Sequence, residues 1–177
     1  MRIYNPIHGP WHRQRSHGPL PKMRFDHHLP PIGVSSDRSV WYAGTSVLGA
    51  VCETFGDSGF LDKGSGQRIC IVRLRLPLQV LNLAGTASRI FGLDQRIGTD
   101  RDYARCQEWA RAFYGRYPMI RGIRWRGRQA GSICIVLNDR VDMNLLELAA
   151  DYDLVDPVMW PGIVRAAHRG RLQILGA

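Results

Sequence analysis

The sequence is poor in lysine, and its positive charge has another source. Lys22 and Lys63 are its only lysines, so the net charge of +9 comes almost wholly from arginine. Arginine carries a planar fork of N–H donors that matches phosphate and carboxylate, which indicates an anionic partner such as a nucleotide, a nucleic acid or an acidic protein. The arginines are spread along the chain without one basic tract, so a genome rich in G and C explains their number equally well.

Long apolar runs are also absent. No segment approaches the roughly 18 apolar residues that a membrane-spanning helix needs, and the N-terminus lacks the apolar core of a signal peptide. We therefore expect a cytoplasmic protein with no membrane partner. The length of 177 residues and the hydrophobic content of 45% predict a single domain over residues 1–177.

Several familiar motifs are missing. The four cysteines form no CxxC pair or zinc-finger spacing and lie in apolar segments, so we expect buried, reduced thiols. The glycine-rich dinucleotide and phosphate loops, the HExxH motif and the GxSxG motif do not occur. His27 and His28 could bind a metal, but adjacent side chains of an extended segment point in opposite directions, so we favour a loop without metal.

The pattern that is present predicts an α+β fold, with a mixed β-sheet core and flanking helices. Residues 1–38 hold six of the ten prolines and five of the six histidines, so we expect an irregular N-terminal segment draped over the core. Strands are expected over residues 39–43, 68–76, 79–83, 123–125, 132–138 and 171–175. Helices are expected from a Ser46 cap to Phe55, over residues 86–91, from an Asp100 cap to Tyr114, from Asp142 to Ala150, and around Pro161.

One carboxylate lies within the segment SVWYAGTSVLGAVCETFG, residues 39–56, which otherwise has the pattern of buried strand, turn and helix. Gly49 and Ala50 precede Glu53 by one helical turn, and these small residues leave space in which a ligand can approach its carboxylate. On this stretch alone, an ordinary solvated glutamate is the more common explanation.

A second segment carries a different signal. The tract RGIRWRGR, residues 121–128, combines four arginines with Trp125 and has the composition of a nucleic-acid surface. Its alternation also fits a strand with Ile123 and Trp125 on the apolar face, which is the interpretation that we favour. The tract and the net charge keep one alternative function open, a non-catalytic basic module that binds nucleotides or nucleic acid.

The order of four short motifs resembles the RES domain family, the toxins of bacterial toxin–antitoxin pairs. The motifs are RIY with Arg2, RFD with Arg24, WYA with Tyr42 and AVCETF with Glu53. The segments YPMIRGIRW and SICIVLNDR are similar to the late strand pair of that family. No motif is specific alone, and their order and spacing carry the resemblance.

The resemblance implies a fold similar to that of ADP-ribosyltransferase toxins and an enzyme that destroys NAD without a metal. It would cleave the nicotinamide–ribose bond by hydrolysis, phosphorolysis or transfer of ADP-ribose to a protein. Glu53 would stabilise the positive charge that develops on the ribose. Arg2 and Arg24 would bind the pyrophosphate or an incoming phosphate, and Tyr42 would contact nicotinamide or ribose. The N-terminal segment would thus form part of the site.

The sequence departs from the family at one position. The family is named after arginine, glutamate and serine, and the serine belongs just after the GIRW strand, where this chain has Gly127. Either the hydroxyl is dispensable, or Ser132 replaces it, or NAD is bound without efficient turnover.

The resemblance also implies a protein partner. That partner would be a helix-turn-helix antitoxin of the Xre type, which would inhibit the toxin by occluding its cleft. Whether the chain also forms a homodimer within the toxin–antitoxin complex stays open.

Overall fold

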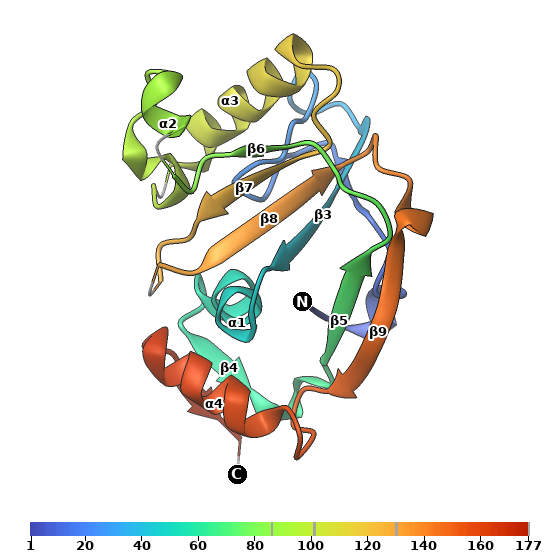
Figure 1. Ribbon diagram of the computed structural model, residues 1–177, viewed down its shortest axis with the longest axis vertical. Helices are drawn as coiled ribbons and strands as arrows, with labels where there is room; N and C mark the ends of the chain where they lie inside the picture. The colour runs from blue at the N-terminus through green and yellow to red at the C-terminus, as the bar shows by residue number, and fades with distance from the viewer. Residues whose placement is uncertain (86, 101, 130, 177) are drawn as a thin grey trace.

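The fold is α+β, as the sequence predicts, and it is built on a mixed sheet. The computed structural model describes residues 1–85, 87–100, 102–129 and 131–176 (Figure 1). The largest sheet has the strand order β2-β3-β8-β7-β6, with neighbours antiparallel except for the parallel pair β6 and β7. Its strands are β2 (Arg15–Gly18), β3 (Ser36–Gly44), β6 (Val80–Asn82), β7 (Gly122–Arg126) and β8 (Ile133–Asn138).

The remaining strands form two smaller sheets. An antiparallel sheet has the order β1-β5-β9, and a parallel pair joins β4 to β10. These strands are β1 (Arg2–Tyr4), β4 (Phe60–Asp62), β5 (Arg68–Leu74), β9 (Leu146–Asp153) and β10 (Gln173–Leu175).

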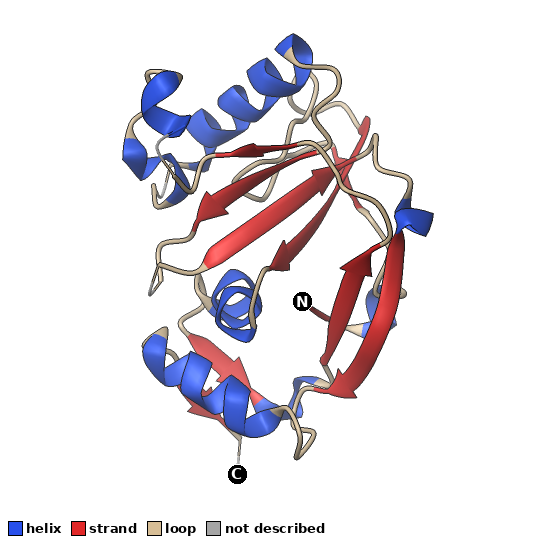
Figure 2. Ribbon diagram, in the orientation of Figure 1, coloured by secondary structure: helices blue, strands red, loops and turns tan. Residues whose placement is uncertain are grey.

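The helices lie around the sheets (Figure 2). In Figure 1, α2 and α3 lie above the five-stranded sheet, while α1 lies below it and is followed further down by α4. The helices are α1 (Val47–Phe55), α2 (Ala87–Ile90), α3 (Tyr103–Arg116) and α4 (Trp160–Arg169), with 3-10 turns at Pro6–His8, Lys63–Ser65, Gln95–Gly98 and Met143–Leu145. Within the described ranges, no helix has the length and apolar character needed to cross a membrane.

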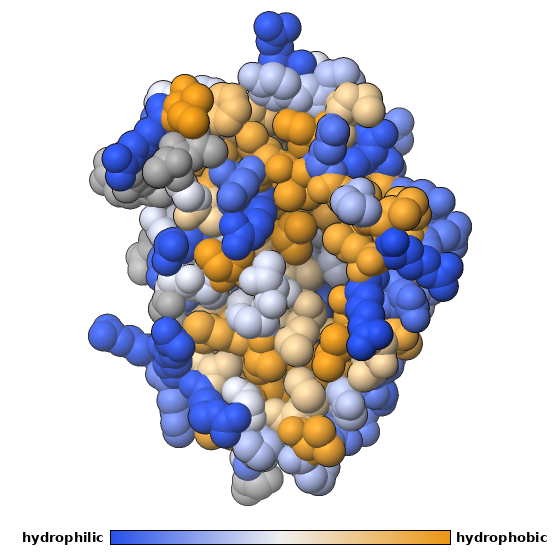
Figure 3. All heavy atoms as spheres, viewed as in Figure 1, coloured by the Kyte–Doolittle hydropathy of each residue, from blue (hydrophilic) through white to orange (hydrophobic). Residues whose placement is uncertain are grey.

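Apolar clusters fill the spaces between these elements. Ile123, Trp125 and Val136 of the large sheet pack with Ala110 and Phe113 of α3. A second cluster joins α1 to α4 and to the β1-β5-β9 sheet, and it includes Val51, Phe55, Ile163, Ala167 and Ile69. On the face in Figure 3, apolar side chains run along the middle, with strongly hydrophilic ones toward the edges. Side chains therefore fill the space that the ribbon drawing leaves open between α1 and β5 (Figure 1).

Most of the expected elements are present. The strand predicted at residues 123–125 is β7, and its Ile123 and Trp125 are buried as the alternation indicates. The helix predicted after Ser46 is α1, and it ends at Phe55 as expected. The four cysteines are free and buried, which confirms that prediction.

The helix predicted from Asp142 to Ala150 is wrong. Asp142 caps a single 3-10 turn, and the chain then enters β9, which pairs with β5 along its length. Cross-strand contacts explain the difference: Arg68 forms an ion pair with Asp153 and contacts Asp151 at 3.1 Å. Pairing with a distant strand thus outweighs the local helical preference of these residues.

Two further expectations need correction. Asp102, and not Asp100, caps α3 by accepting a hydrogen bond from the backbone N–H of Ala104 at 3.0 Å, and the helix continues to Arg116. Residues 1–38 are also more regular than expected, because they contribute β1, β2 and the start of β3. Both short strands find partners in distant strands, β5 and β3, which local composition does not reveal.

Candidate active site

Helix α1 is held against the ends of β3 and β8 by small residues. The Ser46 hydroxyl accepts a hydrogen bond from the N–H of Gly49 at 3.1 Å, a cap that contributes about 1 kcal/mol. A Cβ at Gly49 would lie 2.5 Å from the carbonyl oxygen of Ile133, and one at Gly44 would overlap the backbone of Gly49 and Ala50. Only glycine permits this close approach, which fixes the position of Glu53 on the next turn.

Glu53 borders two pockets. We call the first the central pocket; it has a volume of about 30 Å³ and is bordered by Arg24, Asp57, Tyr103, Arg128 and Ser132, among others. The second, the side pocket, has a volume of about 260 Å³ and is bordered by Arg2, Arg15, Tyr42 and Gly44, among others. The structure thus brings the predicted residues around one carboxylate, but it places them in two groups.

The charge state of Glu53 depends on its burial. Burial raises the pKa of Glu53 to about 7, although the Cys134 thiol and the charge of Arg24 oppose the rise. The negative charge of Asp57 adds to it. A carboxyl group that titrates near neutral pH can act as a base or as an ionised stabiliser under physiological conditions.

Arg24 lines the central pocket but is itself buried, with 7% of its surface exposed. Its Nη1 donates hydrogen bonds to the carbonyl oxygens of Asp100 and Ile97, the latter at 3.4 Å. The guanidinium lies over the ring of Tyr103, 4.7 Å from its centroid. Arg24 therefore joins the loop before α3 to the pocket, and it places a positive charge near Glu53.

Tyr42 is positioned in the side pocket by a buried carboxylate. Its hydroxyl donates to Asp26 Oδ1 at 3.2 Å and accepts from the N–H of Phe25 at 2.9 Å. Asp26 also binds Nη2 of Arg15 at 2.6 and 2.8 Å. Burial acts to raise the pKa of Asp26, but Arg15 and two backbone N–H groups outweigh it and lower the pKa. Burial and the charges of Asp26 and Glu53 raise the pKa of Tyr42, so its hydroxyl stays protonated.

Arg2 borders the side pocket, whereas Arg24 borders the central pocket. Its Nη1 donates to the carbonyl oxygens of Trp11 and Arg13, both at 3.0 Å, and its guanidinium lies over Trp41. Burial lowers the pKa of Arg2 to about 10. Arg2 also borders an outer cleft of about 610 Å³, which shares Arg2 and Arg15 with the side pocket. Arg2 and Arg24 thus line different pockets, an arrangement that the sequence did not reveal.

His27 and His28 lie in the loop between β2 and β3, where their rings contact other parts of the fold. His27 Nε2 lies 2.7 Å from Asp139 Oδ1, and His28 Nε2 lies 3.0 Å from the carbonyl oxygens of both Gly18 and Val34. In the part of the chain that the structure describes, no group of three or more histidine, cysteine or acidic side chains is arranged to hold a metal ion.

Comparison with known proteins shows the family of the chain and a related fold. The family model described as RES domain matches residues 1–155. The chain belongs to the RES domain family. No curated protein sequence matches it significantly. Among solved structures, a chain from the M. tuberculosis MbcT-MbcA toxin–antitoxin complex is similar, with a TM-score of 0.63 and 17% identity over 92% of this chain and 86% of the other. At this identity the similarity shows a shared fold.

The backbone at Gly127 lies close to the side chain of Ser132. A Cβ at Gly127 would lie 2.5 Å from Ser132 Oγ and 3.5 Å from Cys134 Sγ. The Gly127 N–H donates to the Ser132 carbonyl oxygen at 2.6 Å, so the two residues face each other across the turn after β7. The buried hydroxyl of Ser132 therefore lies beside the place that a side chain at position 127 would occupy.

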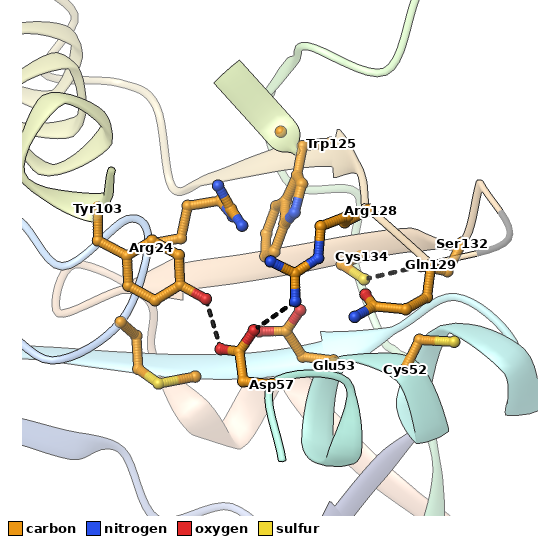
Figure 4. Close-up of a pocket in the computed structure, with 13 residues that line it drawn as sticks. Arg24, Cys52, Glu53, Asp57, Tyr103, Trp125, Arg128, Gln129, Ser132 and Cys134 are labelled. Atoms are coloured by element: carbon orange, nitrogen blue, oxygen red, sulfur yellow. Dashed lines mark hydrogen bonds and ion pairs between the residues drawn. The ribbon is translucent and has the colours of Figure 1, made fainter. Parts of the chain in front are cut away.

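Three residues of this candidate site were missed by sequence reasoning. Tyr103 donates a hydrogen bond to Asp57 Oδ2, and Arg128 Nη2 lies 3.1 Å from Asp57 Oδ1 (Figure 4). Asp57 lies four residues after Glu53, a spacing that could have indicated it. Arg128 belongs to the basic tract already noted, whereas Tyr103 gives no local signal. Burial and the bond to Asp57 raise the pKa of Tyr103 to about 12.

Proposed function

We propose that this chain is the toxin of a type II toxin–antitoxin pair and degrades NAD by cleaving its nicotinamide–ribose bond. The observation that carries the proposal is the position of Glu53, whose raised pKa and two flanking pockets provide an ionisable carboxylate between two arginine-containing sites. RES domain toxins generally act on NAD, and a protein of similar fold forms a toxin–antitoxin complex. Both facts support the proposal.

The proposed reaction breaks the bond between ribose C1′ and the pyridinium nitrogen. The bonding electrons leave with nicotinamide, which becomes neutral, and positive charge develops on the ribose. Ionised Glu53 stabilises this charge or holds the ribose hydroxyls. In hydrolysis a water oxygen then bonds to C1′, and its proton passes to Glu53 or to solvent. Inorganic phosphate or a protein side chain takes the place of water in phosphorolysis or ADP-ribosyl transfer.

The other residues act in binding. Tyr42 contacts nicotinamide or ribose from the side pocket, where Asp26 fixes its hydroxyl. Arg24 supplies positive charge to the pyrophosphate on one side of Glu53, and Arg2 to the dinucleotide or an anionic acceptor on the other. Ser132 supplies the hydroxyl that the glycine at position 127 lacks. NAD is a substrate in this scheme, and the reaction uses no metal.

The proposed partner is an antitoxin with a helix-turn-helix of the Xre type. It inhibits the chain in the cytoplasm by covering the cleft that leads to Glu53. Because this partner blocks the substrate, its co-expression should protect cells from loss of NAD. A homodimer within the complex is compatible with this scheme.

The decisive experiment incubates the purified chain with NAD, with and without inorganic phosphate, and identifies the products. We expect release of nicotinamide, and the second product reports whether water or phosphate is the acceptor. Glu53→Gln should slow the release by about 100-fold or more, whereas Glu108→Gln, on the exposed face of α3, should leave it unchanged.

A different result would favour a different function. If NAD persists, and the chain instead binds nucleic acid with a steep loss of affinity as salt rises, the basic binding module is correct. The net charge of +9 makes that alternative the one to test.

A further inference from the structure

Three elements meet at the mouth of the central pocket through one carboxylate. Asp57 follows the end of α1, Tyr103 begins α3, and Arg128 lies in the turn between β7 and β8. Figure 4 shows the Asp57 carboxylate between the Tyr103 hydroxyl and the Arg128 guanidinium, near Glu53. Each of the two donors contacts a different oxygen of the carboxylate.

The donors are held in place without Asp57. Gln129, next to Arg128, donates to the carbonyl oxygen of Gly56 at 2.7 Å, which fastens the β7–β8 turn to the end of α1. Tyr103 is held under the guanidinium of Arg24, 4.7 Å from its ring centroid. The phenol of Tyr103 and the guanidinium groups of Arg24 and Arg128 therefore all border the central pocket. This set of donors suits an anion with several oxygens.

The contacts of Asp57 with these donors are weak. Its side chain is 61% exposed, and that of Arg128 is 30% exposed, so their ion pair lies largely in solvent. Exposed pairs of this kind contribute little to stability. The diphosphate of the dinucleotide carries two negative charges and four non-bridging oxygens, twice what one carboxylate offers, so it can bind several of these donors at once. Exchange of Asp57 for a phosphate is thus favourable at little cost to the fold.

The volume of the central pocket supports the same conclusion. About 30 Å³ has room for only one or two water molecules, so a nucleotide cannot enter while the Asp57 contacts are closed. Asp57, Tyr103 and Arg128 all border this pocket, so the carboxylate must leave its two donors before a phosphate can bind to them.

We infer that Tyr103 and Arg128 form the binding site for a phosphate group of the dinucleotide, and that Asp57 occupies this site until the substrate arrives. The inference rests on the proposed function, because NAD supplies the phosphate. Asp57 then acts as an internal competitor: it keeps the pocket ordered when empty, and it lowers the affinity for any ligand that cannot displace it.

The test measures binding of ADP to the full chain by calorimetry, because ADP carries the diphosphate but no bond to nicotinamide. Asp57→Asn should tighten binding by about threefold, since the competing charge is gone while the size is kept. Arg128→Ala should weaken it by about tenfold. Asp37→Asn and Arg126→Ala, exposed residues of the same types, should leave the dissociation constant within about twofold of the wild type.

The double variant separates displacement from a general change of charge. If Asp57 competes for Arg128, most of the gain in ADP affinity from Asp57→Asn should be lost once Arg128 is alanine, because only the contact with Tyr103 is left to compete for. If Asp57 acts only as a nearby negative charge, the threefold gain in ADP affinity persists in the double variant and the inference is wrong. An unchanged affinity in Asp57→Asn or in Arg128→Ala also overturns it.

Failure of the inference and failure of the proposed function give different results. If the wild type cleaves NAD but neither Asp57→Asn nor Arg128→Ala changes the affinity for ADP, the phosphate site is wrong and the proposed activity stands. The expected ADP affinities without any NAD cleavage keep the site and reject the activity. Circular dichroism of each variant checks that the fold is retained.

Discussion

The two pockets that share Glu53 are held together in different ways. In the side pocket, the polar groups have partners that belong to the fold: the hydroxyl of Tyr42 binds Asp26, which is 0% exposed, and Arg2 binds two backbone carbonyl groups. In the central pocket, Tyr103 and Arg128 bind Asp57, whose side chain is 61% exposed. One pocket is thus fixed before a ligand arrives, and the other can exchange a protein carboxylate for a ligand.

Glu53→Gln should produce the largest effect, because it removes the one carboxylate that both pockets share. The amide keeps the size of the side chain but cannot stabilise the developing positive charge, so NAD cleavage should fall by about 100-fold or more. Nicotinamide release measures the loss, and thermal unfolding checks the fold. Wild-type rates in this variant would remove Glu53 from the reaction.

Arg24→Lys should have the next largest effect. Lysine keeps the charge, but it cannot both bind the carbonyl oxygens of Ile97 and Asp100 and present a second donor to the pocket. We expect cleavage to fall by about tenfold or more, with a lower melting temperature. Arg116→Lys, at the exposed end of α3, is the matched control. A fully active Arg24→Lys would show that charge alone suffices.

The pH dependence should report the titration of Glu53. If the ionised carboxylate is required, kcat/KM should fall by about tenfold per pH unit below the pKa of about 7 and level off above it. A profile that is flat from pH 5 to 8 would contradict this role.

Stability should change with pH in the opposite direction. Because folding raises the pKa of Glu53 from 4.5 to about 7, the folded chain binds more protons than the unfolded chain between these values. The free energy of unfolding of the wild type, relative to Glu53→Gln, should therefore fall by about 2 to 3 kcal/mol as the pH rises through this range. Denaturant unfolding of both proteins at several pH values measures this difference.

The smallest effect is expected at the turn after β7. Ser132→Ala should slow cleavage by about 3- to 10-fold, because it removes about one hydrogen bond to the substrate. Gly127→Ser alone should not help, because its Cβ would lie 2.5 Å from Ser132 Oγ. The double variant with serine at 127 and alanine at 132 removes that clash and should recover part of the rate. Ser35→Ala, at an exposed position, is the control, and equal rates in all variants would show that no hydroxyl from this turn is needed.

The sequence predicted the fold class and most elements because their signals are local. The alternation in β7 and the Ser46 cap of α1 depend on neighbouring residues, and both were correct. The helix expected from Asp142 was wrong because pairing with β5, more than 70 residues earlier, decides the conformation of β9. Contacts between distant segments leave little trace in a single sequence.

The same distinction applies to the site. Glu53 stood out because a carboxylate was out of place in an apolar segment. The division of Arg2 and Arg24 between two pockets, and the contact of Asp57 with Tyr103 and Arg128, depend on how α1, α3 and the β7–β8 turn meet. Only the structure brings these segments together.

The contact between Gly44 and Gly49 has a genetic consequence. These glycines touch no substrate in the proposed reaction, yet any side chain at either position would push α1 away from the ends of β3 and β8. A selection for cells that survive production of the chain should therefore recover substitutions at Gly44 and Gly49 beside those at Glu53. Such survivors would keep every reacting side chain but carry α1 in a displaced position. The positions of their substitutions would identify the residues that hold α1 in place.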